Sequence, residues 1–161
     1  MKEYGRLGTV LMAVAFTTGV GYGADNKLAD DAAKILAKAE KIELYSLDPS
    51  RIRDKDKLKD DFHGFGILGK TTLKGDAKKD LVSAFQKGLA GQIDPAACFN
   101  PRHGIRATYD SKTVDLVICF ECAQFMVYGD KDDKGKSLLV NKKPQTAFDK
   151  ALKDAGLEKA K

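Results

Sequence analysis

The residue types best able to do chemistry gather in two short stretches of this sequence. The first is CFNPRHGIR, residues 98–106, and the second is ICFEC, residues 118–122; together they hold all three cysteines. Thiolate and imidazole groups are ligands that zinc prefers, and thiolates also suit copper(I). The sequence thus indicates a site for zinc or another soft metal ion. Its candidate ligands are Cys98, His103, Cys119 and Cys122.

A β-hairpin is predicted to bring the two stretches together. Two runs of strand type flank a turn at residues 110–112. With a three-residue turn there, His103 lies opposite Cys119, and Cys98 lies near Cys122 at the open end of the hairpin. A slip of one residue would move these side chains to the other face.

A bend at residues 120–121 decides how the thiols can be used. In an extended strand Cys119 and Cys122 point to opposite faces, with their Cα atoms about 10 Å apart. A disulfide needs Cα atoms less than about 7 Å apart. Only a bend lets both residues reach one ion or each other. A Cys98–Cys122 disulfide needs no bend and is the favoured pairing.

The sequence leaves three functions open for a protein with this cluster. The first is an exported binding protein whose metal is functional or structural. The second is a disulfide-closed envelope module that binds a protein partner without metal. The third is a thiol-dependent enzyme with Cys98 or Cys119 as nucleophile, its thiolate favoured by nearby positive charge. An odd number of cysteines in an exported protein calls for such an explanation.

The histidine and the arginines of the first stretch also have structural interpretations. His103 can simply hydrogen-bond a carbonyl at a strand edge. Arg102 and Arg106 can pair with Asp115 or Glu121 across the strands. A metal or catalytic role is therefore only one use of these side chains.

Composition predicts one soluble domain that binds neither nucleic acid nor nucleotide. The chain has 161 residues, 32% charged and 43% hydrophobic, and a net charge of +5. Its basic residues are interleaved with acids, whereas a nucleic-acid surface needs a basic stripe. GFGILGKT, residues 64–71, fits the P-loop pattern, but the residues that follow favour a strand. A P-loop must instead lead directly into a helix.

The N-terminus predicts export. Lys2 and Arg6 precede an uncharged run at residues 7–24, and small residues make cleavage after Gly23 plausible. This pattern is typical of a signal peptide over residues 1–23. The alternative is an uncleaved anchor, the only case in which membrane contact is expected. The mature chain is thus expected in the periplasm or outside the cell, where disulfides persist.

The remaining pattern predicts an α+β fold with an antiparallel sheet meander and two to three packed helices. Residues 24–61 would supply a helix, a strand and a charged linker, and residues 62–156 the core with the Cys/His hairpin. Helices are expected at 27–40, at 76–91 and after Pro144, and strands at 41–47, 65–73, 105–109, 113–120, 124–128 and 137–140.

CFNPRHGIR, the hairpin and VDLVICFEC together resemble a family of small uncharacterised bacterial proteins, with the core pattern C-F-x-P-R-H-G-I-R and V-D-L-V-I-C-F-x-C. The resemblance covers about residues 62–156. It implies that GFGILGKT and the hairpin belong to one domain. It implies no activity or ligand.

Overall fold

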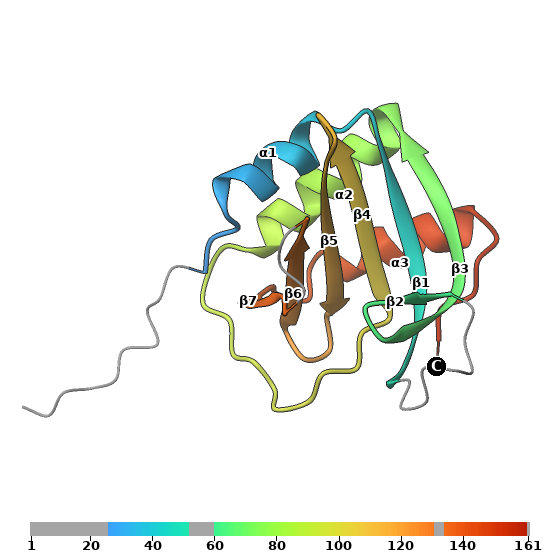
Figure 1. Ribbon diagram of the computed structural model, residues 1–161. Helices are drawn as coiled ribbons and strands as arrows, with labels where there is room; N and C mark the ends of the chain where they lie inside the picture. Colours follow the sequence, from blue (N-terminus) through green and yellow to red (C-terminus); the bar gives the residue numbers. More distant parts are fainter. Residues whose placement is uncertain (1–25, 52–59, 131–133, 161) are drawn as a thin grey trace, which may run out of the picture.

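The structure is a computed structural model that describes residues 26–51, 60–130 and 134–160. Within these residues the chain forms a single α+β domain, as the sequence predicts (Figure 1). The helices are α1 (Asp30–Lys38), α2 (Gly75–Gly88) and α3 (Gln145–Asp154). The strands are β1 (Lys41–Arg51), β2 (Asp61–Phe62), β3 (Phe65–Lys74), β4 (His103–Tyr109), β5 (Lys112–Cys119), β6 (Gln124–Gly129) and β7 (Lys136–Leu139). They make one curled antiparallel sheet in the order β2-β3-β1-β4-β5-β6-β7.

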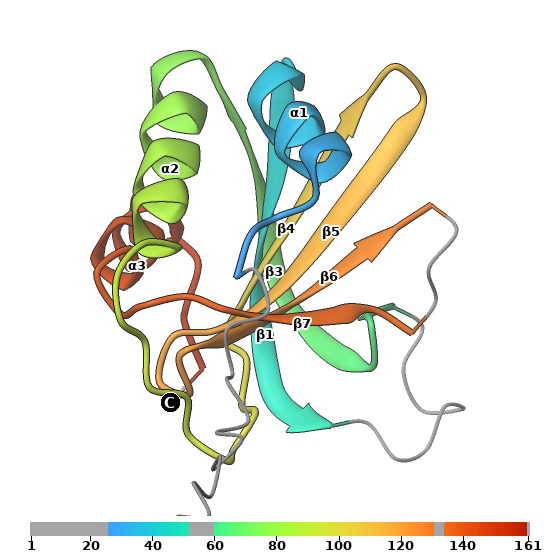
Figure 2. The same cartoon turned by 90° about the vertical axis from the view of Figure 1, so that its left-hand side faces the viewer.

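The three helices lie on one face of this sheet, where they bury the main hydrophobic core (Figure 2). Each helix carries apolar residues at helical spacing, and alternate residues of β1 and β5 meet them from the sheet. The helical contributors include Ile35, Leu36, Leu81, Phe85, Phe148 and Leu152, and the strand contributors include Ile42, Leu44, Leu116 and Ile118. Removal of these side chains from water is the main stabilising term of the fold.

The β4–β5 hairpin differs from the prediction by one residue of register. Its turn consists of Asp110 and Ser111 alone, whose φ angles are 52° and 58°. Positive φ at both positions is typical of a two-residue type I′ turn, which suits the twist of antiparallel strands. His103 therefore lies opposite Ile118, and the predicted pairing of His103 with Cys119 is wrong.

The opposite face of the sheet carries a smaller cluster of apolar side chains. Its buried members are Tyr45, Leu47, Phe62, Phe65 and Val117. The short β2–β3 hairpin supplies the two phenylalanines. Since alternate residues of a strand share a face, Cys119 lies on the same side of β5 as Val117.

β1 is longer than the sequence predicts, and β3 contains the P-loop-like motif. β1 continues to Arg51, whereas the predicted strand stopped before Asp48-Pro49; an irregular register between Leu47 and Arg51 accommodates the proline. The P-loop-like residues lie almost wholly in β3, a strand as expected.

The predicted signal peptide lies outside the described residues. Among the described helices, none is long and apolar enough to cross a membrane.

Candidate functional site

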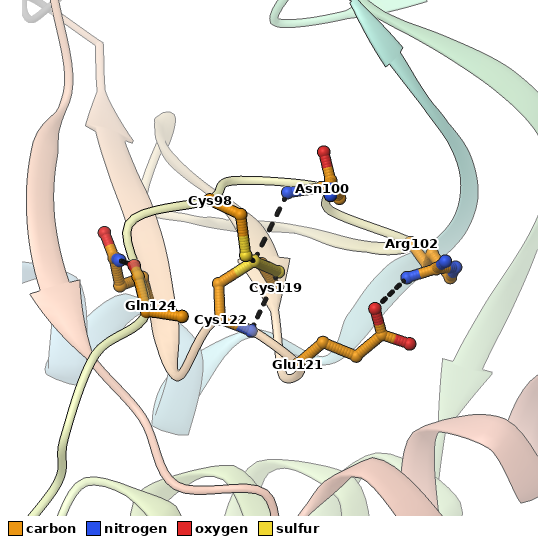
Figure 3. The surroundings of a disulfide bond; sticks show 8 residues. Cys98, Asn100, Arg102, Cys119, Glu121, Cys122 and Gln124 are labelled. Carbon is orange, nitrogen blue, oxygen red and sulfur yellow. Dashed lines mark hydrogen bonds and ion pairs between the residues drawn. A yellow bond between two sulfur atoms is a disulfide. The ribbon is translucent and has the colours of Figure 1, made fainter.

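A disulfide joins Cys119, the last residue of β5, to Cys122 (Figure 3). Residues 120–123 form the turn between β5 and β6, in which the Ala123 N–H donates to the Phe120 carbonyl at 3.2 Å. The turn brings the two cysteine Cα atoms to 5.3 Å, within the range a disulfide needs. The preference for a Cys98–Cys122 disulfide is therefore corrected, because it assumed an unbent strand.

Cys98 approaches this disulfide from the connection between α2 and β4. The Ala96 N–H donates to the Cys122 carbonyl at 3.0 Å, and the Gln124 side-chain amide donates to the Ala96 carbonyl. These bonds hold the connection against the turn. Cys98 Sγ lies 2.8 Å from Cys122 Sγ. Cys98 is free and exposed, whereas Cys119 and Cys122 are 1% and 0% exposed.

Two backbone amides point at the buried sulfurs. The Cys122 N–H donates to Cys119 Sγ at 3.1 Å, and the Asn100 N–H donates to Cys122 Sγ at 3.4 Å. A hydrogen bond to the charged form of an acid favours that form, so these amides would stabilise a thiolate released at either sulfur. The turn and the connection thus each place one backbone N–H donor beside a sulfur of the disulfide.

An ion pair joins the disulfide turn to Arg102, the residue just before β4. Arg102 Nη1 lies 2.7 Å from Glu121 Oε2, and Arg102 Nε donates to the Ala160 carbonyl at 3.2 Å. The expected pairing of these arginines across the strands is thus confirmed for Arg102. Since Glu121 is exposed, the pair adds at most about 1 kcal/mol of stability.

His103 does not join the cysteines. Its ring packs against Phe120 and Phe148 on the helix-covered side, and its Nε2 lies 2.9 Å from Asp149 Oδ1. Burial lowers the pKa of His103 to about 4, although the Asp149 carboxylate opposes this shift. The imidazole is therefore neutral at neutral pH. This position follows from the corrected register, which turns His103 and Cys119 to opposite faces.

The structure thus gathers three of the four predicted metal ligands, the cysteine sulfurs, and leaves the histidine apart. Within the described ranges, no three His, Cys, Asp or Glu residues are arranged to hold a metal ion. The Cys/His metal set stays a prediction, which elemental analysis of the purified protein would test.

A second polar cluster, on the face away from the helices, was not predicted as a site. Arg106 makes a double hydrogen bond to the buried carboxylate of Asp115, with distances of 2.8 and 2.6 Å. His63 Nε2 lies 2.7 Å from the same carboxylate. The sequence indicated the Arg106–Asp115 pair. It carried no signal for His63, which comes from a distant hairpin.

Comparison of the chain with protein-family models, curated proteins and solved structures finds no match. The chemistry of the three-cysteine cluster therefore rests on its own geometry.

Proposed function

We propose that this protein exchanges disulfide bonds with cysteines of a partner protein, and that Cys98 is the sulfur that meets the partner. The observation that carries the proposal is the 2.8 Å separation between Cys98 Sγ and Cys122 Sγ. A free, exposed thiol there touches a sulfur of an existing disulfide. Exchange proceeds by attack of a thiolate on a disulfide sulfur, so the two reacting atoms are already in contact.

The first step moves the disulfide to the surface. The Cys98 thiolate attacks Cys122 Sγ, the Cys98–Cys122 bond forms, and the Cys119–Cys122 bond breaks. The electron pair of the broken bond leaves with Cys119, whose sulfur accepts the Cys122 N–H at 3.1 Å. The proton lost by Cys98 balances the proton gained by Cys119, so this step involves no net oxidation.

The second step transfers the disulfide to the partner. A partner thiolate attacks Cys98 Sγ, forms a mixed disulfide and releases Cys122 as a thiolate. A second partner thiolate then attacks the partner's own sulfur in that mixed disulfide and releases Cys98. The partner loses two electrons and two protons and gains a disulfide, and the protein is left with three thiols. The same steps in reverse reduce a partner disulfide.

Burial explains why the chain would need all three cysteines. With Cys119 and Cys122 almost wholly covered, a partner cannot reach the resting disulfide directly. The exposed Cys98 links solvent to the buried pair. The expectation that the mature chain is exported supports this role, because disulfides persist outside the cytoplasm.

Oxidation of a reduced Cys-x-x-Cys peptide tests the proposal. The protein, purified without reductant, is mixed with the peptide, and the loss of peptide thiols is followed over time. We expect the native protein to oxidise about one equivalent of peptide, since it holds one disulfide. Cys98→Ser, which keeps the Cys119–Cys122 disulfide, should slow oxidation at least about 100-fold, because the peptide must wait for local opening of the turn.

A matched variant separates an exposed thiol from a well-placed one. Cys98→Ser combined with Ala77→Cys restores an exposed thiol on α2, on the far side of the sheet. This double variant should remain as slow as Cys98→Ser. Oxidation of the peptide by Cys98→Ser at the native rate would refute the proposal.

A further inference from the structure

A polar pocket of about 410 Å³ lies on the face of the sheet away from the helices. Pockets of this volume accommodate small molecules. The side chains that line it belong to His63, Arg106, Thr113, Asp115, Tyr128 and Asp130. They come from the β2–β3 hairpin and from β4, β5 and the end of β6, and the pocket does not include the cysteines.

His63 reaches this pocket from a backbone conformation that histidine rarely adopts. It occupies the two-residue turn of the β2–β3 hairpin with Gly64, and their φ angles are 54° and 85°. Asparagine and glycine are the usual residues at such a turn. A histidine there costs on the order of 1 kcal/mol, and such strain persists where other contacts hold it. Those contacts are the Asp115 carboxylate at 2.7 Å and a stacked Tyr128 ring with a centroid separation of 3.7 Å.

The Asp115 carboxylate fixes which nitrogen of His63 carries the proton. Burial raises the pKa of Asp115, but the hydrogen bonds from Arg106 and His63 together lower it by more, so the group is a carboxylate. A carboxylate only accepts hydrogen bonds, and His63 Nε2 therefore donates to it. In the neutral imidazole, Nδ1 is then an acceptor. Nδ1 makes no hydrogen bond to the described residues. Since every buried side-chain nitrogen and oxygen among those residues has a partner, Nδ1 is not buried and solvent reaches it.

The charges that line the pocket leave one carboxylate unmatched. Arg106 and Asp115 neutralise each other through their double hydrogen bond. Asp130 remains, oriented by the Thr113 N–H that donates to its Oδ1 at 2.8 Å. The lining residues thus present the Asp130 carboxylate and the Nδ1 atom of His63, the ring nitrogen that does not contact Asp115. Such a surface suits a ligand that is a cation and a multiple hydrogen-bond donor.

We propose that this pocket binds a small organic primary ammonium ion, with the Asp130 carboxylate and His63 Nδ1 as its acceptors. An –NH₃⁺ group is a compact charge with three donors, which matches two acceptors and a water molecule. The whole chain carries a net charge of +5, so overall electrostatics oppose a cation. Binding of the cation would therefore be due to the acceptor groups of the pocket and not to the net charge of the protein. This proposal is independent of thiol exchange.

Titration of the ¹⁵N-labelled protein with 1,4-diaminobutane, followed by NMR chemical shifts, tests the site. We expect saturable shifts at Tyr128, Thr113 and Asp130. The neutral analogue 1,4-butanediol should give none. Asp130→Asn should weaken binding at least about 10-fold, a loss of about 1.4 kcal/mol. His63→Asn should weaken it similarly while preserving the fold, because asparagine suits the turn.

Asp110→Asn is the matched control. Asp110 is an exposed carboxylate in the β4–β5 turn that does not line this pocket, and its loss changes net charge as Asp130→Asn does. It should bind the diamine like the native protein. Equal weakening by both variants would show attraction to bulk charge only and would overturn the proposal. So would absence of saturable shifts, or equal shifts with butanediol.

Discussion

At the scale of single residues, His103 shows how burial determines the role of a side chain. The sequence offers it as a metal ligand or as a structural hydrogen-bonding group. In the structure it is 2% exposed and bonded to Asp149. A buried imidazole is costly to protonate, and burial lowers its pKa from 6.5 to about 4. His103 is therefore a structural residue with a consequence for acid stability.

We predict that His103 makes the fold sensitive to mild acid. Because its pKa is lower in the folded than in the unfolded chain, the unfolded state binds a proton first as pH falls. Its contribution is fully present above pH 6.5 and is lost as pH falls towards 4. The loss is about 3 kcal/mol, at 1.36 kcal/mol per pKa unit. Urea unfolding of the native protein and of His103→Gln across this range measures it.

The comparison isolates the contribution of the histidine, because the two proteins differ at residue 103 alone. His103→Gln should be less stable at pH 7.5 but should lose less stability between pH 6.5 and 4. Equal losses of unfolding free energy over this interval would contradict the assignment.

Residue types alone predicted which side chains near each other in the sequence would group together, but not which distant side chains would contact them. The three cysteines and the Arg106–Asp115 pair lie near one another in the sequence-based hairpin, and the structure keeps both groupings. Asp149 and His63 were not foreseeable as partners. Each is more than 40 residues from the side chain it contacts, and no local pattern encodes such a contact.

At the scale of elements, the length of one turn decided which side chains share a face. The sequence predicted the positions of both strands of the β4–β5 hairpin well, because their residue types are typical of strands. Asp110-Ser111 is not one of the sequence pairs that strongly indicate a two-residue turn, and three residues were assumed. Since side chains alternate along a strand, that one residue separated His103 from Cys119.

Close packing of the β2–β3 hairpin on β4 yields an element-scale prediction. A Cβ atom at Gly104 would lie 2.7 and 2.9 Å from the Phe62 ring, which is 2% exposed and unable to withdraw freely. Gly104→Ala should therefore destabilise the protein by about 1–3 kcal/mol, the range for overpacking. Urea unfolding at pH 7.5 measures the change.

Gly129→Ala is the control for this prediction. Gly129 ends β6, and a Cβ atom there meets nothing within 4 Å. Its substitution should change the unfolding free energy by less than about 0.5 kcal/mol, as for most surface positions. Comparable losses in the two variants would show that contact with Phe62 is not the cause.

At the scale of the whole molecule, the order of the strands in the sheet could not be predicted from the sequence. β1 lies inside the sheet between β3 and β4, although it precedes both in the chain. The helices follow from their apolar spacing and the β4–β7 meander from its short connections, but insertion of β1 depends on contacts between distant segments. The resulting sheet has one face covered by helices and another that carries the polar pocket. The cysteine cluster lies at the β5–β6 end of this sheet.

The disulfide map of Cys119→Ala tests the central claim, that Cys98 can attack Cys122. In the native chain, trypsin leaves Cys119 and Cys122 in one peptide, residues 113–131, and Cys98 in another, residues 88–102. Once Cys119 is removed, the contact at 2.8 Å predicts a Cys98–Cys122 disulfide, and mass spectrometry without reduction should find the two peptides cross-linked. Two separate peptides, each alkylated at a free thiol, would contradict the claim.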